Sequence, residues 1–367
     1  MESDVVIVGG GLTGLSLARR LDEAHIDYVL LEARDRFGGR ILSQASDNSS
    51  HPNVRHDLGP SWIWPGQPRI ERLVREFNLR PFQQYSEGTL VYEEADGSVR
   101  RDFNYSTMAG SLRIGCGVAS ITDAIVDVLD RQKLLLSHTV TRIARNKGSF
   151  RLTATTVNGE ETIRARHVVV AAPPRVVEST MTFDPPLPGD VVKALRAVPT
   201  WMAGQAKLVA IYDQPFWRNM GLNGDGISRR GPLVEIHDAT PASGEMGALF
   251  GFVGIPVGLQ QRERSSLIDS ALPQLEAMYG QKASNPVDII VKDWANDRFT
   301  ATTHDKDGSG HPQLATPVSI AGLVDEGLMF ATSEMGPQFG GLLEGALEAS
   351  EAVARRILAA DIDPVWT

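Results

Sequence analysis

Hydrophobic residues recur along the first part of the chain in patterns that predict alternating strands and helices. Residues 4–80 read as a strand, a helix, a second strand and a loop, which ends in an amphipathic stretch from Ile70 to Leu79. Two alternating strands cover residues 133–145 and 149–157, and the pair Asn158-Gly159 that follows is a strong hairpin signal. This pattern is typical of an α/β fold.

The middle of the chain is richer in strand patterns. Strand-like residues surround Leu90-Val91-Tyr92, and further strands are predicted near residues 205–212 and 246–253. A helix is predicted over residues 265–278. The glycine-rich stretch from Gly221 to Gly231 has no such pattern, and we expect it to be a mobile connection.

One long helix is predicted near the C-terminus. Its apolar positions follow a 3.6-residue period, namely Leu342, Leu343, Ala346, Leu347, Val353, Ala354, Ile357 and Leu358.

A glycine turn follows the first strand directly, as Gly9-Gly10-Gly11-Leu12-Thr13-Gly14. Gly9 permits the tight turn, Gly11 lets backbone amides approach a pyrophosphate, and Gly14 lets the helix pack close against the strand. Glu32 ends the second strand, where a carboxylate can accept hydrogen bonds from both ribose hydroxyls and would repel a 2′-phosphate. Together these features predict a dinucleotide site.

The residues after Glu32 favour a flavin over a nicotinamide dinucleotide. The run Ala33-Arg34-Asp35-Arg36-Phe37-Gly38-Gly39-Arg40 places two more glycines and three arginines beside the expected phosphates. We therefore interpret the site as one for FAD.

At these residues the sequence resembles the flavin amine oxidase family, the group of monoamine and polyamine oxidases. Its signature is a glycine turn, then LEAR, then GGR. Further blocks are similar to the family's later flavin loops, linker, last strand and last helix, namely Asp57-Leu58-Gly59, Val168 to Pro174, Phe183 to Pro188, Leu328 to Glu334 and Gly340 to Ala346.

The resemblance implies a set of FAD-binding residues. They are Gly9, Gly11, Leu12, Thr13, Gly14, Glu32, Ala33, Arg34, Gly39, Arg40, Gly59, Pro60, Ser61, Val140, Ala171, Trp294, Ser333, Glu334, Gly341, Leu342 and Leu343. For Trp294 the alternative is a core tryptophan.

The resemblance also implies the domain organisation. A Rossmann-like FAD-binding domain is expected from the discontinuous segments 1–80, 117–196 and 294–367. A smaller α+β substrate-binding domain on a mixed or antiparallel sheet is expected from residues 81–116 and 197–293. The fold class is thus α/β.

Composition agrees with this interpretation and excludes other classes. The 367 residues suggest about two domains, and the formal net charge of −9 with no long basic run argues against a nucleic-acid-binding protein. The single cysteine, Cys116, excludes an internal disulfide framework and favours a reducing, cytoplasmic compartment. No hydrophobic leader or C-terminal span is recognisable, so we expect no membrane anchor.

Lys207 bears most on the reaction. It lies in the apolar run Ala206 to Tyr212, on the same predicted strand face as Val209 and Ile211. An outward-facing lysine on an edge strand is one interpretation. The following Pro215-Phe216-Trp217 resembles the run that follows the flavin-contacting lysine of the family, which implies instead that Lys207 holds a water at flavin N5.

The implied reaction is oxidation of a carbon–nitrogen bond. A hydride passes from the carbon beside a neutral amine to flavin N5, the imine hydrolyses, and dioxygen reoxidises the flavin to give hydrogen peroxide. The amine must first lose its proton, so activity is expected to rise with pH. The helix entered at Gly340-Gly341 could stabilise charge near flavin N1, although close packing also explains these glycines.

The sequence departs from the family at several positions. Counted from Trp294, the cysteine to which monoamine oxidases attach FAD is replaced by Thr303, so we expect FAD to be bound non-covalently. The two tyrosines of the aromatic cage are replaced by His304 and Leu342. His304 is then either a substrate contact or titrating base, or part of an exposed loop. Thr332 stands where the family commonly has glycine.

Other aromatic side chains could replace the missing cage. Trp62, Trp64 and Phe339 are the candidates for the substrate cavity, and apolar packing explains the two tryptophans equally well. The missing tyrosines also leave two other functions open. One is a desaturase or carbon–carbon dehydrogenase on the same scaffold, and the other is a non-catalytic FAD-binding protein.

Overall fold

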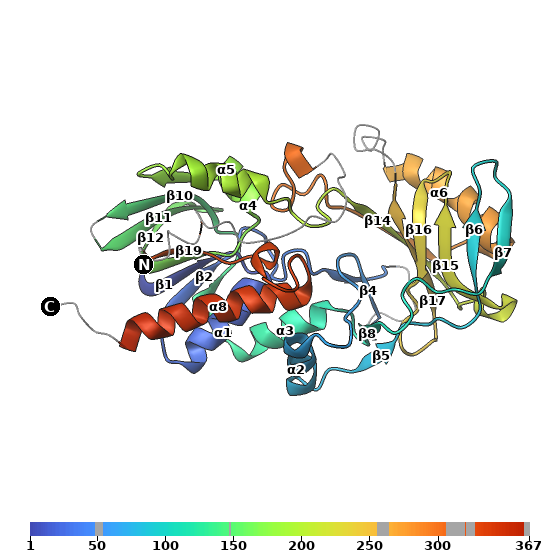
Figure 1. Cartoon of the computed structure of the whole chain (residues 1–367), viewed down its shortest axis with the longest axis horizontal. Coiled ribbons are helices and arrows are strands. Elements are labelled where there is room, and N and C mark those ends of the chain that lie inside the picture. Colours follow the sequence, from blue (N-terminus) through green and yellow to red (C-terminus); the bar gives the residue numbers. More distant parts are fainter. Residues whose placement is uncertain (48–53, 147, 255–263, 306–319, 321–326, 363–367) are drawn as a thin grey trace.

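The computed structural model describes residues 1–47, 54–146, 148–254, 264–305, 320 and 327–362. The strands within these residues form two large sheets, of eight and seven strands, and two small sheets of two strands each. Figure 1 shows the two large sheets at opposite ends of an elongated molecule. The residues between them connect the two ends several times.

The first large sheet has the order β13-β10-β11-β12-β1-β2-β9, and β19 also pairs with β12. Its centre is parallel, because β1 pairs in parallel with both β12 and β2. The strands are β1 (Glu2–Val8), β2 (Tyr28–Leu31), β9 (Leu134–Leu135), β10 (Thr139–Asn146), β11 (Ser149–Thr156), β12 (Gly159–Val170), β13 (Thr182–Asp184) and β19 (Leu328–Phe330).

Helices cover both faces of this sheet, which explains why β1 is apolar at consecutive positions. Val5 and Ile7 pack against the helices on one face, and Val6 and Val8 belong to the core on the other. Figure 1 shows α1, α3 and α8 below the sheet and α4 and α5 above it. The helices are α1 (Leu12–Glu23), α2 (Pro68–Glu76), α3 (Ala119–Val128), α4 (Pro174–Thr180), α5 (Gly189–Ala197) and α8 (Leu343–Ile362).

The second large sheet has the order β18-β14-β17-β16-β15-β6-β7. All its neighbouring strands are antiparallel except β15 and β6, which are parallel. The strands are β6 (Thr89–Glu93), β7 (Val99–Phe103), β14 (Ala206–Tyr212), β15 (Leu222–Ser228), β16 (Leu233–Asp238), β17 (Gly247–Val253) and β18 (Asp288–Asp293).

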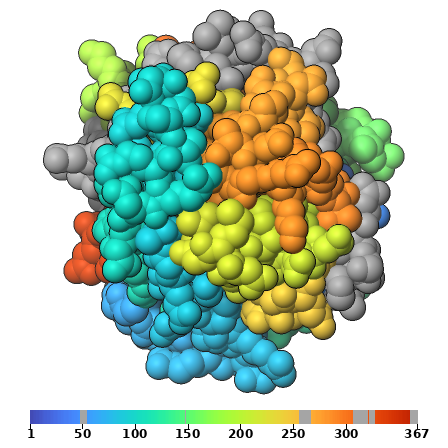
Figure 2. Space-filling model, turned by 90° about the vertical axis from the view of Figure 1, so that its right-hand side faces the viewer, coloured from blue at the N-terminus to red at the C-terminus, as the bar shows by residue number. Residues whose placement is uncertain are grey.

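Strand β14 is buried on both faces. Leu208 and Ala210 lie in the core that helix α6 (Arg264–Tyr279) completes, whereas Val209 and Ile211 face the opposite way, toward Leu58. Figure 2 looks onto this end of the molecule, where α6 (orange) lies beside the β6 and β7 segment (cyan). The face of β14 that carries Val209 therefore points toward the first sheet.

Short elements connect the two large sheets. The paired strands are β3 (Ser43–Ala45) with β4 (Arg55–Asp57), and β5 (Pro81–Gln83) with β8 (Leu112–Ile114). The 3-10 helices are η1 (Arg131–Lys133), η2 (Arg218–Met220), η4 (Gln281–Ser284), η5 (Thr303–Asp305) and η7 (Ser333–Met335). Among the described residues, no helix combines the length and apolarity that crossing a bilayer requires.

The prediction of a mobile connection over Gly221 to Gly231 is wrong. Most of this stretch is the ordered strand β15, in which Asn223 and Asp225 are 0% and 1% exposed. Gly224 has a positive φ of 84°, and a Cβ atom there would lie 2.7 Å from the Cβ of Asp238. The glycine at position 224 therefore permits close packing of β15 against Asp238.

A second difference concerns residues 133–145, predicted as one strand. The chain forms β9 and β10 with a break between them, where Ser137 adopts a positive φ of 58°. The sequence pattern also does not predict strand β16. The assignment of segments to two domains stays a prediction, although each large sheet draws its strands from the segments assigned to one of them.

Candidate active site

A cavity of about 750 Å³ is lined by residues of both large sheets. This volume lies within the range of about 300–1,000 Å³ that is typical of small-molecule and cofactor sites. The cavity contains most of the residues that the resemblance implied for FAD, which are Gly9, Gly11, Leu12, Thr13, Glu32, Ala33, Arg34, Gly39, Arg40, Gly59, Pro60, Ser61, Val140, Ala171, Trp294, Ser333, Gly341, Leu342 and Leu343.

The glycine turn has the geometry that a pyrophosphate requires. Gly9 has a φ of 114°, and a Cβ on Gly14 would lie 2.0 Å from the carbonyl oxygen of Gly9. At Gly11 the nearest atom to such a Cβ is 4.0 Å away, so the backbone is open to the cavity. Helix α1 begins after Gly11 without a side-chain cap, and its first N–H groups are available to an anion.

Glu32 lies at the end of β2 and fixes the shape of the turn. Its Oε2 accepts a hydrogen bond from Gly10 N at 2.7 Å, and its Oε1 accepts one from Arg34 N at 2.8 Å. A carboxylate has about four acceptor positions, so these bonds leave capacity for ribose hydroxyls. The residue is 4% exposed and lines the cavity.

Two arginines of the predicted flavin run have partners from the C-terminal third. Arg34 donates to Asp297 Oδ1 at 2.5 Å and to Thr300 Oγ1 at 2.9 Å. Arg40 contacts both carboxylate oxygens of Glu334, at 2.6 and 3.1 Å. Burial alone would raise the pKa of Glu334, but the charge and hydrogen bonds of Arg40 outweigh burial and lower it. Glu334 therefore holds Arg40 and does not line the cavity itself.

Thr332 has a hydroxyl without a hydrogen-bond partner, although the residue is only 3% exposed. It lines the same cavity as the glycine turn. An unpaired buried hydroxyl costs about 1–3 kcal/mol, so a ligand oxygen beside it would be favoured. With the open glycine turn and Glu32, this hydroxyl fits a bound dinucleotide.

Lys207 is buried, 2% exposed, and its side chain lines the cavity. Its Nζ donates to Ser61 Oγ at 2.7 Å and to Gly59 O at 3.2 Å, and lies 3.7 Å from the centre of the Phe250 ring. Burial lowers its pKa from 10.5 to about 7, against the opposing effect of the Asp57 charge. The interpretation as an outward-facing lysine is therefore wrong.

Tryptophans form part of the cavity wall. Trp294 is 5% exposed and donates from Nε1 to Leu58 O at 2.8 Å. Trp62 donates from Nε1 to Gln84 Oε1 at 2.9 Å, and Trp64, 38% exposed, lines the cavity nearer to solvent. Leu342 also lines the wall. These side chains give the cavity a largely apolar surface.

The structure places His304 and Phe339 outside the cavity. His304 is exposed because the neighbouring Asp305 turns inward, where it accepts hydrogen bonds from Arg175, Thr200 N and Thr302. This position does not support a role of His304 as a substrate contact or base. Thr303, beside it, is also exposed. Residues 306–308 of the predicted exposed loop lie outside the described residues. Phe339 N donates to Glu348 Oε2 at 3.1 Å, and its side chain does not reach the wall.

Sequence reasoning missed several residues of the wall. They are Met108, His138, Trp201, Gln205, Glu235, Phe252, Arg298 and Phe299, among others. For Glu235 and Phe252 a signal existed, because each alternates with a second polar or aromatic residue along a strand, His237 and Phe250 respectively.

Comparisons with known proteins agree with this geometry. The sequence model described as flavin containing amine oxidoreductase matches residues 82–358, and the one described as NAD(P)-binding Rossmann-like domain matches residues 7–77. Putrescine oxidase of Kocuria rosea is 25% identical, over 98% of this chain and 96% of that protein. Flavin-containing amine oxidase B of Bos taurus is 23% identical, over 100% of this chain and 88% of that protein.

Solved structures share the fold. A putrescine oxidase with bound putrescine has a TM-score of 0.79 at 19% identity, over 98% of this chain and 99% of that one. Cyclohexylamine oxidase from Brevibacterium oxydans has a TM-score of 0.82 at 19% identity, over 99% and 100%. The predicted α/β fold with a Rossmann-like dinucleotide domain is thereby confirmed.

Proposed function

The chain belongs to the flavin-containing amine oxidoreductase family, and on this premise we propose that it oxidises an amine to an imine and transfers the electrons to dioxygen. It is a flavin-dependent amine oxidase, and its cofactor is FAD. The observation that carries the finer proposal is the buried ammonium of Lys207 in the wall of the same cavity as the open glycine turn. Neither alternative function needs a buried cation there.

The residues of the first sheet would hold FAD. The glycine turn and the N-terminus of α1 receive the pyrophosphate, Glu32 receives a ribose, and the unpaired hydroxyl of Thr332 adds a donor. Binding is non-covalent in this proposal. Its support is that Cys116 is exposed and does not line the cavity, and that Thr303 stands at the expected attachment position.

FAD, when bound, supplies the hydride acceptor at N5 for the carbon beside the amine nitrogen, and returns to its oxidised form with dioxygen, which leaves as hydrogen peroxide. The protein's own contribution begins with Lys207. Ser61 and Gly59 fix its Nζ, which would then present a positive charge and its third hydrogen-bond donor to a water or to reduced oxygen in the cavity. A nearby positive charge stabilises the negative charge that forms on oxygen.

The cavity wall would select the neutral form of the amine for reaction. Trp62, Trp294 and Leu342 line it with apolar surface, which disfavours an ammonium at the reacting carbon. Most of the amine in solution is protonated at neutral pH. The rate of flavin reduction is therefore expected to rise with pH through an amine-like pKa.

The domain organisation belongs to the same proposal. Residues 1–80, 117–196 and 294–367 would bind FAD, and residues 81–116 and 197–293 would bind the amine. The support is that the first sheet carries the glycine turn, whereas the second carries Lys207 on the face toward the cavity.

Two experiments with purified holoenzyme test the proposal. Anaerobic mixing with a panel of amines should bleach the yellow colour of the flavin, whereas bleaching only by unsaturated or polycyclic lipids would favour the desaturase, and no bleaching a non-catalytic protein. In stopped-flow reoxidation, Lys207→Met should retain FAD but react more slowly with dioxygen. Lys193→Met, at an exposed position, is the control. Reoxidation of Lys207→Met at the parental rate would remove Lys207 from the mechanism.

A further inference from the structure

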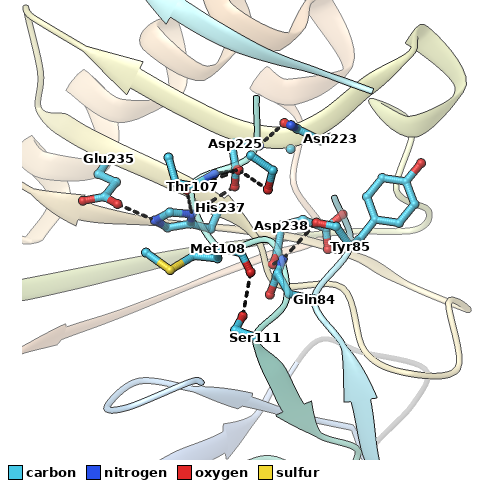
Figure 3. Close-up of polar contacts among 12 residues, drawn as sticks. Gln84, Tyr85, Thr107, Met108, Ser111, Asn223, Asp225, Glu235, His237 and Asp238 are labelled. Atoms are coloured by element: carbon cyan, nitrogen blue, oxygen red, sulfur yellow. Dashed lines mark hydrogen bonds and ion pairs between the residues drawn. The ribbon is translucent and has the colours of Figure 1, made fainter. Parts of the chain in front are cut away.

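A fully buried histidine lies directly behind the cavity wall. His237 is 0% exposed, and both of its ring nitrogens contact carboxylates: Nδ1 lies 3.0 Å from Asp225 Oδ1, and Nε2 lies 3.0 Å from Glu235 Oε1 (Figure 3). A carboxylate only accepts, and a neutral imidazole has one N–H donor. Two such hydrogen bonds therefore require the doubly protonated, positively charged ring.

The electrostatics agree with a charged ring. Burial alone would lower the pKa of His237, but the hydrogen bonds and negative charges of Asp225 and Glu235 outweigh burial and raise it. The other groups packed against the ring are Thr107, whose hydroxyl lies 3.3 Å from Nδ1, and the aromatic rings of Trp62, Phe250 and Phe252. Among the described residues, the two carboxylates are thus the charged groups in contact with it.

Asp225 is held firmly in place. It is 1% exposed, and its Oδ2 accepts hydrogen bonds from Ser106 Oγ at 2.8 Å, Thr107 N at 2.8 Å and Thr107 Oγ1 at 3.2 Å. Its own N–H donates to Asn223 Oδ1 at 2.9 Å. Figure 3 shows this cluster joined to Glu235 through the ring of His237. The histidine therefore has a fixed anchor on its inner side.

Glu235 is the outer member and reaches the cavity. Its side chain is 40% exposed and lines the wall. Phe252 on β17 pairs with Lys207 on one side and with Glu235 on the other, so the three form one row on one face of the sheet. Two strand spacings separate the backbones of Lys207 and Glu235, about 10 Å. Oε2 of Glu235 has no hydrogen bond to any described residue.

We propose that Asp225, His237 and Glu235 form one hydrogen-bonded unit that selects substrates with a second cationic group, beyond the amine that is oxidised. Glu235 is the contact for that cation, and His237 and Asp225 are positioning residues that fix its carboxylate. The two negative charges and one positive charge leave the unit with a net charge of −1. Substrates with a carboxylate at this place, such as amino acids, are repelled. This inference rests on the proposed amine oxidation.

The test compares two amines with the same chain, 1,4-diaminobutane and n-butylamine, in anaerobic flavin reduction of the holoenzyme. We expect the diamine to be preferred, because a hydrogen-bonded charge pair at Glu235 stabilises only the diamine. We compare the two amines by kred/Kd, the rate constant of flavin reduction divided by the dissociation constant of the amine. Glu235→Gln should lower the diamine-to-butylamine ratio of this quantity by about tenfold or more, because only the diamine loses a charged partner at this position. Glu160→Gln, at an exposed carboxylate outside the cavity, should leave the ratio unchanged.

The pH profile tests the positioning role. In the parental enzyme the diamine preference should depend less on pH between pH 6 and 8 than in Asp225→Asn, because the two carboxylates raise the pKa of His237 and so favour its protonated form. Asp225→Asn removes one of the two negative charges that raise the pKa of His237, so the pKa of His237 should fall. His237 should then lose its proton, and the diamine preference should fall, as pH rises through this range. If Asp225 had only a structural role, Asp225→Asn would lower kred/Kd by the same factor for both amines at every pH.

The outcomes separate the two proposals. If Glu235→Gln keeps the parental ratio, or if the parental enzyme prefers butylamine, the selection unit is refuted while amine oxidation stands. If neither amine nor any other in the panel bleaches the flavin, the proposed function itself fails. Should Asp225→Asn not fold, Glu235→Gln decides the question alone.

Discussion

Replacement of Lys207 by methionine is expected to stabilise the protein at neutral pH. Lys207 is buried, and burial lowers its pKa from 10.5 to about 7. Each unit of pKa difference corresponds to about 1.36 kcal/mol, so holding the side chain protonated in the folded state costs roughly 5 kcal/mol relative to the unfolded chain. Lys207 therefore lowers the free energy of unfolding, and in the proposed function it places a positive charge in the cavity.

The sign of the pH dependence follows from the lowered pKa. Between about pH 7 and 10.5 the unfolded chain binds the proton more strongly than the folded protein does. The free energy of unfolding therefore rises with pH across this window. Methionine does not titrate, so Lys207→Met removes this pH dependence. The variant also lacks the hydrogen bonds from Lys207 to Ser61 and Gly59, which reduces the increase in its free energy of unfolding. We expect Lys207→Met to be more stable by about 1–4 kcal/mol at pH 7, and the difference to shrink toward pH 10.

Urea unfolding of the FAD-free proteins, followed by far-ultraviolet circular dichroism at pH 6, 7, 8.5 and 10, measures this difference. The exposed control Lys193→Met should match the parental protein at each pH. A Lys207→Met variant that is less stable than the parent at pH 7, or a difference that does not depend on pH, would refute the reasoning.

Three further substitutions test the cofactor site. Gly14→Ala places a Cβ 2.0 Å from a carbonyl oxygen of the glycine turn, so FAD should be lost on gel filtration, whereas Gly189→Ala, with nothing within 4 Å, should keep it. Thr332→Val should weaken FAD binding about threefold to tenfold in fluorescence titration with little change in stability of the FAD-free protein, because it removes an unpaired hydroxyl. Glu334→Gln should cost about 3–5 kcal/mol in urea unfolding at pH 7, since it leaves Arg40 without its counter-charge. The lowered pKa of Glu334 means that the parental protein loses this stabilisation as pH falls below about 4.5, whereas the variant has none to lose.

The cofactor half of the site could be predicted because its requirements are local. A tight turn, a close helix and an acid at a strand end each demand particular residue types at fixed spacing, and Gly9, Gly14 and Glu32 have the predicted geometry. Lys207 could be singled out from the sequence because it is a single cation within an apolar strand, and alternation shows which neighbours share its face. Its role at the flavin was implied only by the resemblance of the Pro215-Phe216-Trp217 run that follows it.

The other half depends on contacts between distant segments, which no local pattern contains. Strand β15 reads as a loop because it is rich in Gly, Asn and Asp, and its order comes from partners such as Thr107 and His237. The role of His304 was implied only by its match to a tyrosine of the family's aromatic cage. The hydrogen bonds that turn Asp305 inward, and so expose His304, come from Arg175 and Thr200, far away in the chain.

The short segment that contains Ser106, Thr107 and Met108 touches both the buried anchor and the cavity. Ser106 and Thr107 bind Asp225, and Met108 lines the wall. Strand β14, in contrast, is packed on both faces and tolerates little change in volume. Under the proposed function, exchanging residues of this segment should therefore change the preferred amine without altering the surroundings of Lys207.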